Sequence, residues 1–542
     1  MTVLTKRPAS VAMLVVAIAA FCALLLALPG QTITTKYLND LFIFLDGVHR
    51  VAEGQVPNRD FHTALGPLVY YAPALGYWLS GNLGGAMPVG MALIVIALAP
   101  AAAHILSSRL RPAIALPLAA FVILVAAVPI NLGESIGALS FAMFYNRIGW
   151  SALALLLVLY LRPSRPGRYQ ALLDAASAAF LIVLMLYIKI SYGVVGLGFL
   201  VFMLLDPRQR GWAAAALVLV VGAGLFIEAL WGGTAAHIAD LAIAGRVSGS
   251  LDTIDELFTA LSRNLSDYVI FAVVMGLALW RTRSLRDFLF FGFCAGSGFM
   301  LITQNFQTWG IISLAAGVAV AVEIMARADG PAADRQRRTM TAGAQLLLLA
   351  FVLPASIQHA AALGLHAALA ATKQGLAAPM PNFDRVRLAQ LWSEGDYPLF
   401  SRYFASLDDG ARALETLESP SGKVLVLDFV GPFSAGLGLK PPYGDSTWYH
   451  WGRTINEENY LPARTVLHDV QIVMEPKWPV EVATAEGLRR LYADYLAEHF
   501  ELARETADWR IHVLRGPPEE TVSRSSGSDP DEEPGDSTRT GG

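Results

Sequence analysis

Charged residues are scarce in this 542-residue chain. Only 15% of its positions are Asp, Glu, Lys or Arg, whereas soluble domains carry about a quarter. The net charge of −4 comes without a large basic block, which excludes nucleic acid as an expected partner. The two cysteines, Cys22 and Cys294, lie in apolar runs and cannot build a disulfide framework or a cysteine metal site. A nucleotide-binding glycine loop is excluded as well, because Gly436 and Gly438 lack the third glycine of that signature.

Long apolar stretches are abundant instead, and 55% of the residues are hydrophobic. A helix of about 20 apolar residues spans a bilayer. The sequence predicts about eleven such transmembrane helices, several of which need flanking residues to reach that length. They lie at 11–28, 88–106, 113–130, 148–161, 172–188, 194–205, 213–230, 268–280, 288–302, 311–326 and 342–353.

Basic residues predict the orientation of these spans, because they stay on the cytoplasmic side. Lys6 and Arg7 place the N-terminus in the cytoplasm, and we interpret the first span as retained because no clear cleavage site follows it. Short basic loops recur at Arg109/Arg111, Arg162/Arg165/Arg168, Arg208/Arg210, Arg281/Arg283/Arg286 and Arg327/Arg335/Arg337/Arg338. All of them can be cytoplasmic if the proline-containing, aromatic stretch 65–79 lies on the outer surface. The C-terminus is then outside.

The predicted fold class is an all-α polytopic membrane domain followed by a small extracytoplasmic α/β domain. The membrane domain covers 1–360 and includes a first outer loop, 30–87, with surface helices at 39–53 and 65–79. Further outer pieces are expected at 131–146 and 232–267. The α/β domain covers 380–516, with strands at 423–429, 471–475, 500–504 and 509–514 and a helix at 482–499. The polar, acidic tail 517–542 is predicted to be disordered.

Two carboxylates, Asp40 and Asp60, stand in the first outer loop, next to the membrane boundary. An ionisable group at that depth points to function, although Asp40 is also a good helix cap. Asp60 has the alternative of a local ion pair with Arg59. His62 fits a polar surface position as well as a substrate contact, since no other His or acid stands at metal-ligand spacing nearby.

This loop resembles the first outer loop of the GT-C superfamily of polytopic glycosyltransferases, which includes bacterial relatives of protein O-mannosyltransferase and the lipid A aminoarabinose transferases. The matching pieces are Asn39-Asp40, Gly54, Pro57, Arg59-Asp60-Phe61, Gly66-Pro67-Leu68 and Tyr70-Tyr71, in the same order and with similar spacing over about forty residues. The usual pair of acids that opens the motif is Asn-Asp here.

The resemblance implies a sugar donor carried on a polyprenyl phosphate or diphosphate, with transfer to an envelope acceptor at the outer face of a bacterial inner membrane. Asp40 would then be the general base, and Asp60 would orient the acceptor or share a divalent cation with Asp40. Two carboxylates suit Mg²⁺ or Mn²⁺ better than zinc. Arg59 and His62 are expected substrate contacts.

Cations at the outer face are candidates for holding the donor phosphate. Arg147 ends an outer loop and offers a planar guanidinium. Lys189 lies in a tight outer turn, where it binds phosphate or merely extends to lipid headgroups. Gln304 and Asn305 occupy another short outer turn, where their amides bind a sugar or, as we favour, cap a helix.

The aromatic loop 431–452 of the soluble domain is either a carbohydrate contact or a surface packed on the membrane domain. Two other functions stay open besides a transferase: a non-enzymatic glycolipid transporter or flippase, and an O-antigen polymerase or ligase. Few acids at mid-membrane depth and no visible inverted repeat count against the transporter.

Overall fold

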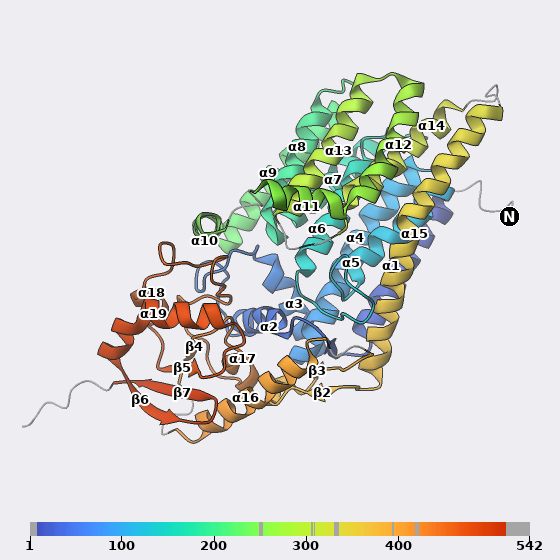
Figure 1. Cartoon of the computed structure of the whole chain (residues 1–542). Coiled ribbons are helices and arrows are strands. Elements are labelled where there is room, and N and C mark those ends of the chain that lie inside the picture. Colours follow the sequence, from blue (N-terminus) through green and yellow to red (C-terminus); the bar gives the residue numbers. More distant parts are fainter. Residues whose placement is uncertain are drawn as a thin grey trace, which may run out of the picture.

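The computed structural model describes residues 8–248, 253–304, 307, 309–329, 335–392, 395–417 and 422–515. Helices form a long bundle, and a smaller domain sits against one end of it (Figure 1). The bundle helices are α1 (Pro8–Ala27), α4 (Leu83–Arg109), α5 (Pro112–Ala127), α6 (Phe144–Val158), α7 (Gln170–Ile188), α8 (Ile190–Leu204), α9 (Arg210–Trp231), α12 (Leu265–Thr282), α13 (Leu285–Thr303), α14 (Ile312–Ala328) and α15 (Arg335–Ala371).

Each of the eleven predicted spans falls on one of these helices. Within the described residues, seven helices are long and apolar enough to cross a membrane, and α5, α6 and α8 are apolar but shorter. The chain is thus an integral membrane protein, and the predicted polytopic helical fold class is confirmed.

The basic loops gather at one end of the bundle through direct contacts. Arg327 donates to the backbone oxygen of Arg162 at 2.8 Å and also to that of Arg109. Asp206 accepts ion pairs from Arg162 at 3.3 Å and from Arg286 at 3.0 Å. This is the arrangement that the positive-inside rule requires if that end faces the cytoplasm.

The first outer loop lies at the opposite end, beside the C-terminal domain (Figure 1). It contains α2 (Leu38–Ala52) and α3 (Leu68–Ser80), close to the predicted surface helices. Tyr37, in the left-handed conformation at φ 56°, occupies the N-cap of α2, so the alternative that Asp40 caps this helix is wrong. The later outer loop forms α10 (Thr234–Val247) and α11 (Ile254–Arg263).

The C-terminal domain contains a four-stranded sheet in the order β4-β5-β7-β6. Its strands are β4 (Val424–Val426), β5 (Ile472–Pro476), β6 (Phe500–Glu505) and β7 (Trp509–Leu514), and its helices include α17 (Phe433–Leu437), α18 (Ala463–Val466) and α19 (Val482–His499). Strands β4 and β5 run parallel, and the other neighbours run antiparallel. All four predicted strands and the predicted helix are present.

A second, three-stranded sheet joins the two parts of the chain. Strand β1 (Thr32–Thr34) of the first outer loop pairs in parallel with β3 (Val386–Leu388), and β2 (Leu376–Ala377) pairs with the other edge of β3. A 3₁₀ turn (Pro381–Phe383) lies between β2 and β3. The start of α2 is therefore anchored to the segment that leads into the C-terminal domain.

Two features differ from the sequence prediction. Helix α15 continues through Pro354 to Ala371, because the alanine-rich stretch beyond the predicted span is itself a good helix former. Helix α16 (Tyr397–Glu415) was not predicted, although it buries Phe400, Phe404 and Leu407 at helical spacing. The predicted disordered tail lies outside the described residues.

Candidate active site

The loop that follows α17 in the C-terminal domain is clamped by the first outer loop. Arg50 of α2 forms two hydrogen-bonded ion-pair contacts with Asp445, at 2.6 and 2.8 Å, and its Nε donates to Asp46 at 2.7 Å. Gln55 Nε2 donates to the backbone oxygen of Pro442 at 3.0 Å. The side chains that follow Asp445 are therefore held in place against α2.

Arg453 is one of those side chains, and it lies within electrostatic range of Asp40. Asp40 is half-buried in the first turn of α2. Burial raises the pKa of the Asp40 carboxyl to about 7, and the positive charge of Arg453 opposes that shift. A carboxyl with a pKa near 7 is suited to take up a proton at physiological pH. Arg453 also lies over the ring of Trp448, at 5.6 Å from its centroid.

Lys189 belongs to the same group of side chains. It lies at the junction of α7 and α8 with an extended backbone (φ −159°, ψ 111°). Its Nζ donates to Asn146 Oδ1 at 3.0 Å and lies 5.4 Å from the centre of the Tyr145 ring. Burial lowers the pKa of the Lys189 ammonium to about 7, and repulsion from Arg453 adds to that effect.

These contacts bring one carboxyl and two cations around the first turn of α6. Tyr145 and Asn146 are the second and third residues of that helix, and Tyr145 is within electrostatic range of both Asp40 and Arg453. A helix N-terminus carries a partial positive charge. The site can therefore hold an anionic group such as phosphate beside a carboxyl that accepts a proton.

The α7–α8 junction is also where the first outer loop packs most tightly. A Cβ on Gly66 would lie 2.2 Å from the carbonyl oxygen of Tyr187, so only glycine fits at this position. The contact fixes the loop against the backbone that presents Lys189.

An apolar groove of about 620 Å³ begins at this contact and lies between α3, α7 and α9. Pro67, Tyr71, Phe180, Tyr187 and Trp231 are among its lining residues. Its volume is in the range of ligand pockets, and its lining suits a hydrocarbon chain. Tyr187 is two residues from Lys189, so the groove ends near the charged site.

Arg59 and Asp60 lie between the groove and the C-terminal domain. Arg59 is exposed and donates to the backbone oxygen of Trp231 at 3.1 Å, at the rim of the groove. The Asp60 carboxylate accepts the Val56 N–H at 2.7 Å and so orders its own turn. The structure places Asp60 in that turn and does not join it to the group formed by Asp40, Lys189 and Arg453.

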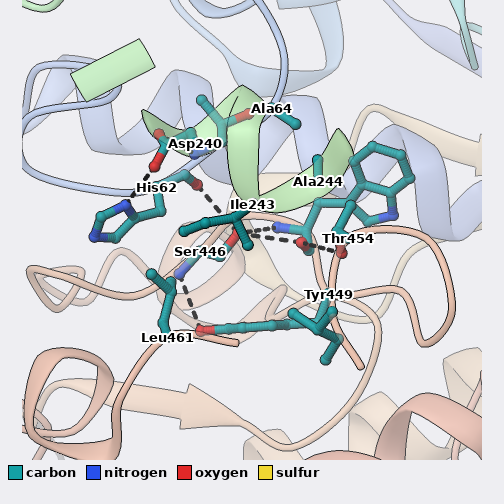
Figure 2. A pocket seen from close by; sticks show the side chains of 12 residues that line it. His62, Ala64, Asp240, Ile243, Ala244, Ser446, Tyr449, Thr454 and Leu461 are labelled. Carbon is teal, nitrogen blue, oxygen red and sulfur yellow. Dashed lines mark hydrogen bonds and ion pairs between the residues drawn. The ribbon is translucent and has the colours of Figure 1, made fainter. Parts of the chain in front are cut away.

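His62 is held by an acid that the sequence did not reveal. Its Nδ1 lies 2.7 Å from Asp240 Oδ1 on α10, and Asn58 donates to the other Asp240 oxygen at 2.8 Å. A pocket of about 30 Å³ lies next to this pair (Figure 2). That is about the volume of one water molecule, and Ser446 on its wall is already bonded to the backbone oxygen of His62. The pocket is a narrow gap in the contact between α10 and the C-terminal domain.

The remaining predicted residues lie elsewhere. Arg147 is 1% exposed and donates to Asn131 Oδ1 and to the backbone oxygen of Ala142, both at 3.0 Å, so the structure does not bring it to Lys189. Gln304 is exposed at the C-cap of α13. Asn305 lies outside the described residues.

A divalent cation fits this arrangement poorly. Mg²⁺ and Mn²⁺ need several oxygen ligands, yet the charged group within electrostatic range of Asp40 is the cation Arg453, which is itself within range of the cation Lys189. In the described part of the chain, no three His, Cys, Asp or Glu side chains group as metal ligands do. The metal stays a prediction from the resemblance.

Sequence reasoning missed Arg453, Tyr145 and Asn146. Arg453 directly follows the aromatic loop 431–452, which was singled out for its tryptophans. That loop does pack on the membrane domain, through Asp445. Tyr145 and Asn146 immediately precede Arg147 in the chain, so the correct outer loop was chosen but not the correct side chains.

Comparison with known proteins found similar solved structures. No protein-family model and no curated protein matches the chain. The chain is similar to ArnT from Cupriavidus metallidurans bound to undecaprenyl phosphate, with 12% identity, a TM-score of 0.45, and 93% of this chain and 99% of that chain covered. It is also similar to ArnT from the same organism in the apo state, with 14% identity and a TM-score of 0.46. That comparison covers 93% of this chain and 98% of the other. ArnT is the lipid A aminoarabinose transferase, of the GT-C class that the first outer loop resembles. A likeness of this size does not extend its reaction or its lipid to this chain.

Proposed function

We propose that this protein is a membrane glycosyltransferase that moves a sugar from a polyprenyl-phosphate-linked donor to an acceptor in the cell envelope, at the outer face of the inner membrane. The observation that carries the proposal is the meeting of Asp40, Lys189 and Arg453 in one site beside an apolar groove. The charged site suits a sugar phosphate, and the groove suits the isoprenoid chain that carries it.

In the proposed reaction, the Asp40 carboxylate takes the proton of an acceptor hydroxyl or amine. The acceptor oxygen or nitrogen then bonds to the anomeric carbon of the donor sugar. The bond between that carbon and the phosphate oxygen breaks, and its electron pair stays on the departing polyprenyl phosphate. Lys189 and Arg453 stabilise the negative charge that develops there.

The two domains contribute different parts of this site. The membrane domain supplies the base, the ammonium of Lys189 and the groove, whereas the C-terminal domain supplies the guanidinium of Arg453. Transfer therefore depends on the contact between the domains, which Arg50 and Asp445 maintain. Transfer to a hydroxyl or amine requires a proton acceptor beside the phosphate site, and Asp40 supplies one, so the arrangement favours the transferase.

The test is mass spectrometry of envelope glycans and lipid-linked sugars in a deletion strain complemented with variants. We expect wild type to restore a glycan that the deletion strain lacks. Asp40→Asn should lower its formation by about 10²- to 10⁴-fold, as loss of a general base does, while the lipid-linked donor accumulates. Asp384→Asn, at an exposed acid, is the matched control and should restore the glycan. Full restoration by Asp40→Asn at equal protein levels would contradict the proposal.

A further inference from the structure

Arg147 carries a buried charge that no acid in the described part of the chain neutralises. It is 1% exposed, and its Nη1 donates to two neutral oxygens, Asn131 Oδ1 and the Ala142 carbonyl. Its Nε and Nη2 have no hydrogen-bond partner among the described residues. A guanidinium stays charged in proteins, and a buried charge without a counter-charge is strongly unfavourable.

The side chains around Arg147 offer further donors. Asn131, 6% exposed, has an unpartnered Nδ2, and His359 of α15, 1% exposed, has an unpartnered Nδ1. Arg147 is within electrostatic range of His359. The His359 ring is stacked on Phe121, with 6.5 Å between centroids and 9° between planes, so its orientation is fixed.

We propose that Arg147, Asn131 and His359 form an enclosed binding site for a small inorganic anion of halide size. Arg147 and Asn131 present N–H groups without a partner, and His359 adds a third in the tautomer that carries its proton on Nδ1. Only an anion both accepts these hydrogen bonds and balances the guanidinium charge. Water would satisfy the hydrogen bonds but not the charge. The burial of all three residues excludes a large ligand.

Helix geometry supports the same ligand and links it to the rest of the molecule. Arg147 is the fourth residue of α6, where the helix N-terminus adds positive potential. Tyr145 and Asn146, in the same turn, face the candidate active site. An anion bound to Arg147 would restrain this turn on the side away from the candidate active site. The site itself does not depend on the proposed transferase function.

Thermal unfolding of the full-length protein in detergent, titrated with sodium chloride against sodium gluconate at constant ionic strength, tests the proposal. An anion that binds only the folded protein raises its Tm in a saturable manner. We expect this rise with chloride and with bromide, and an anomalous scattering peak for bromide next to Arg147 Nη2 in crystals. A Tm that does not respond to chloride or bromide would overturn the proposal. So would a response to inorganic phosphate alone.

Variants separate this site from general salt effects. Arg147→Gln should fold and lose the chloride response, because it no longer carries the charge that the anion balances. Asn131→Ala, which removes one donor, should weaken the apparent affinity for chloride about tenfold. Arg464→Gln, at an exposed arginine of the C-terminal domain, should respond as wild type does. If Arg147→Gln does not fold, the chloride titration of Asn131→Ala tests the proposed site instead. An unchanged chloride response in either Arg147→Gln or Asn131→Ala would refute the site.

Discussion

Arg50 of helix α2 and Asp445 of the C-terminal domain form a buried two-point ion pair, with nitrogen–oxygen distances of 2.6 and 2.8 Å. Their side chains are 4% and 3% exposed. Asp40 lies in the same helix as Arg50, and Arg453 follows Asp445 in the same loop region. This pair therefore fixes the distance between the proposed base and a proposed phosphate ligand.

Breaking the pair should destabilise the protein strongly. Arg50→Met leaves the two buried acids Asp445 and Asp46 without their cation, which costs about 3–5 kcal/mol or more in the free energy of unfolding. Asp445→Asn should cost less, because Arg50 keeps its ion pair with Asp46. The double variant should cost less than the sum of the two, because only Asp46 is then left without a counter-charge. Denaturant unfolding in detergent measures the free energy of unfolding of wild type, the two single variants and the double variant. The exposed pair Arg490–Glu457, at 62% and 70% exposure, is the control and should contribute about 0–1 kcal/mol. Additive losses at Arg50 and Asp445 would contradict the prediction.

The transfer rate should depend on pH with a maximum near 7. Asp40, with a pKa of about 7, accepts a proton only when it is deprotonated, so the rate rises with pH on the acid side. Lys189, also with a pKa of about 7, holds phosphate only when it is protonated, so the rate falls on the alkaline side. Steady-state rates between pH 5 and pH 9, roughly two units on either side of that maximum, measure the profile. Lys189→Arg keeps the charge at all these values and should lose only the alkaline limb. An alkaline limb that survives in Lys189→Arg would rule out Lys189 as its origin.

The same pKa value has a consequence for stability. The Asp40 carboxyl is raised from 3.8 to about 7 in the folded protein, so the folded state keeps a proton that the unfolded chain releases between these values. Its contribution to the free energy of unfolding is therefore present at low pH and falls as pH rises from about 4 to 7. Burial also raises the pKa values of Asp428 and Asp445, to about 7 and about 6, so stability falls over this range in Asp40→Asn as well. Comparing the pH dependence of unfolding for the two proteins should therefore show a steeper fall in wild type than in Asp40→Asn.

Removing the charge of Arg453 should move the whole pH profile to higher values. Arg453 stabilises the carboxylate of Asp40 and disfavours the ammonium of Lys189, so it lowers both pKa values. Arg453→Met should shift both limbs upward by roughly 1 pH unit, whereas Arg453→Lys should shift them less. The measurement is again the rate profile. A purely structural role would lower the rate without moving either limb.

The membrane architecture could be predicted because a helix in lipid must be apolar along its length. Strand and helix positions in the C-terminal domain followed from alternation and helical spacing, and β7 matched its predicted range. Helix α16 was missed even though its sequence carries the helical pattern of Phe400, Tyr403, Phe404 and Leu407. That signal was present and could have been found.

The candidate site was only half predictable. Asp40 and Lys189 stood out because charges at a membrane boundary are conspicuous in an apolar chain. Arg453 did not, because it lies in a domain of ordinary composition where arginines are common. Its role depends on how the loop after α17 docks on α2, which is a long-range contact that no local pattern encodes. The same holds for Asp240, which reaches His62 from a different outer loop.

Gly66 offers a test of whether the outer loop sets the position of Lys189. In Gly66→Ala the new Cβ would lie 2.2 Å from the Tyr187 oxygen and 2.7 Å from its carbonyl carbon, so the loop must move off the α7–α8 junction. Such overpacking costs about 1–3 kcal/mol, and the transfer rate per folded molecule should fall because Lys189 and the rim of the groove shift together. Gly222→Ala, in α9 with open space around the new Cβ, should keep the wild-type rate and gain up to about 1 kcal/mol. Thermal unfolding and transfer rates of the two variants measure the effect. Wild-type values for Gly66→Ala would show that the loop and the junction are not coupled.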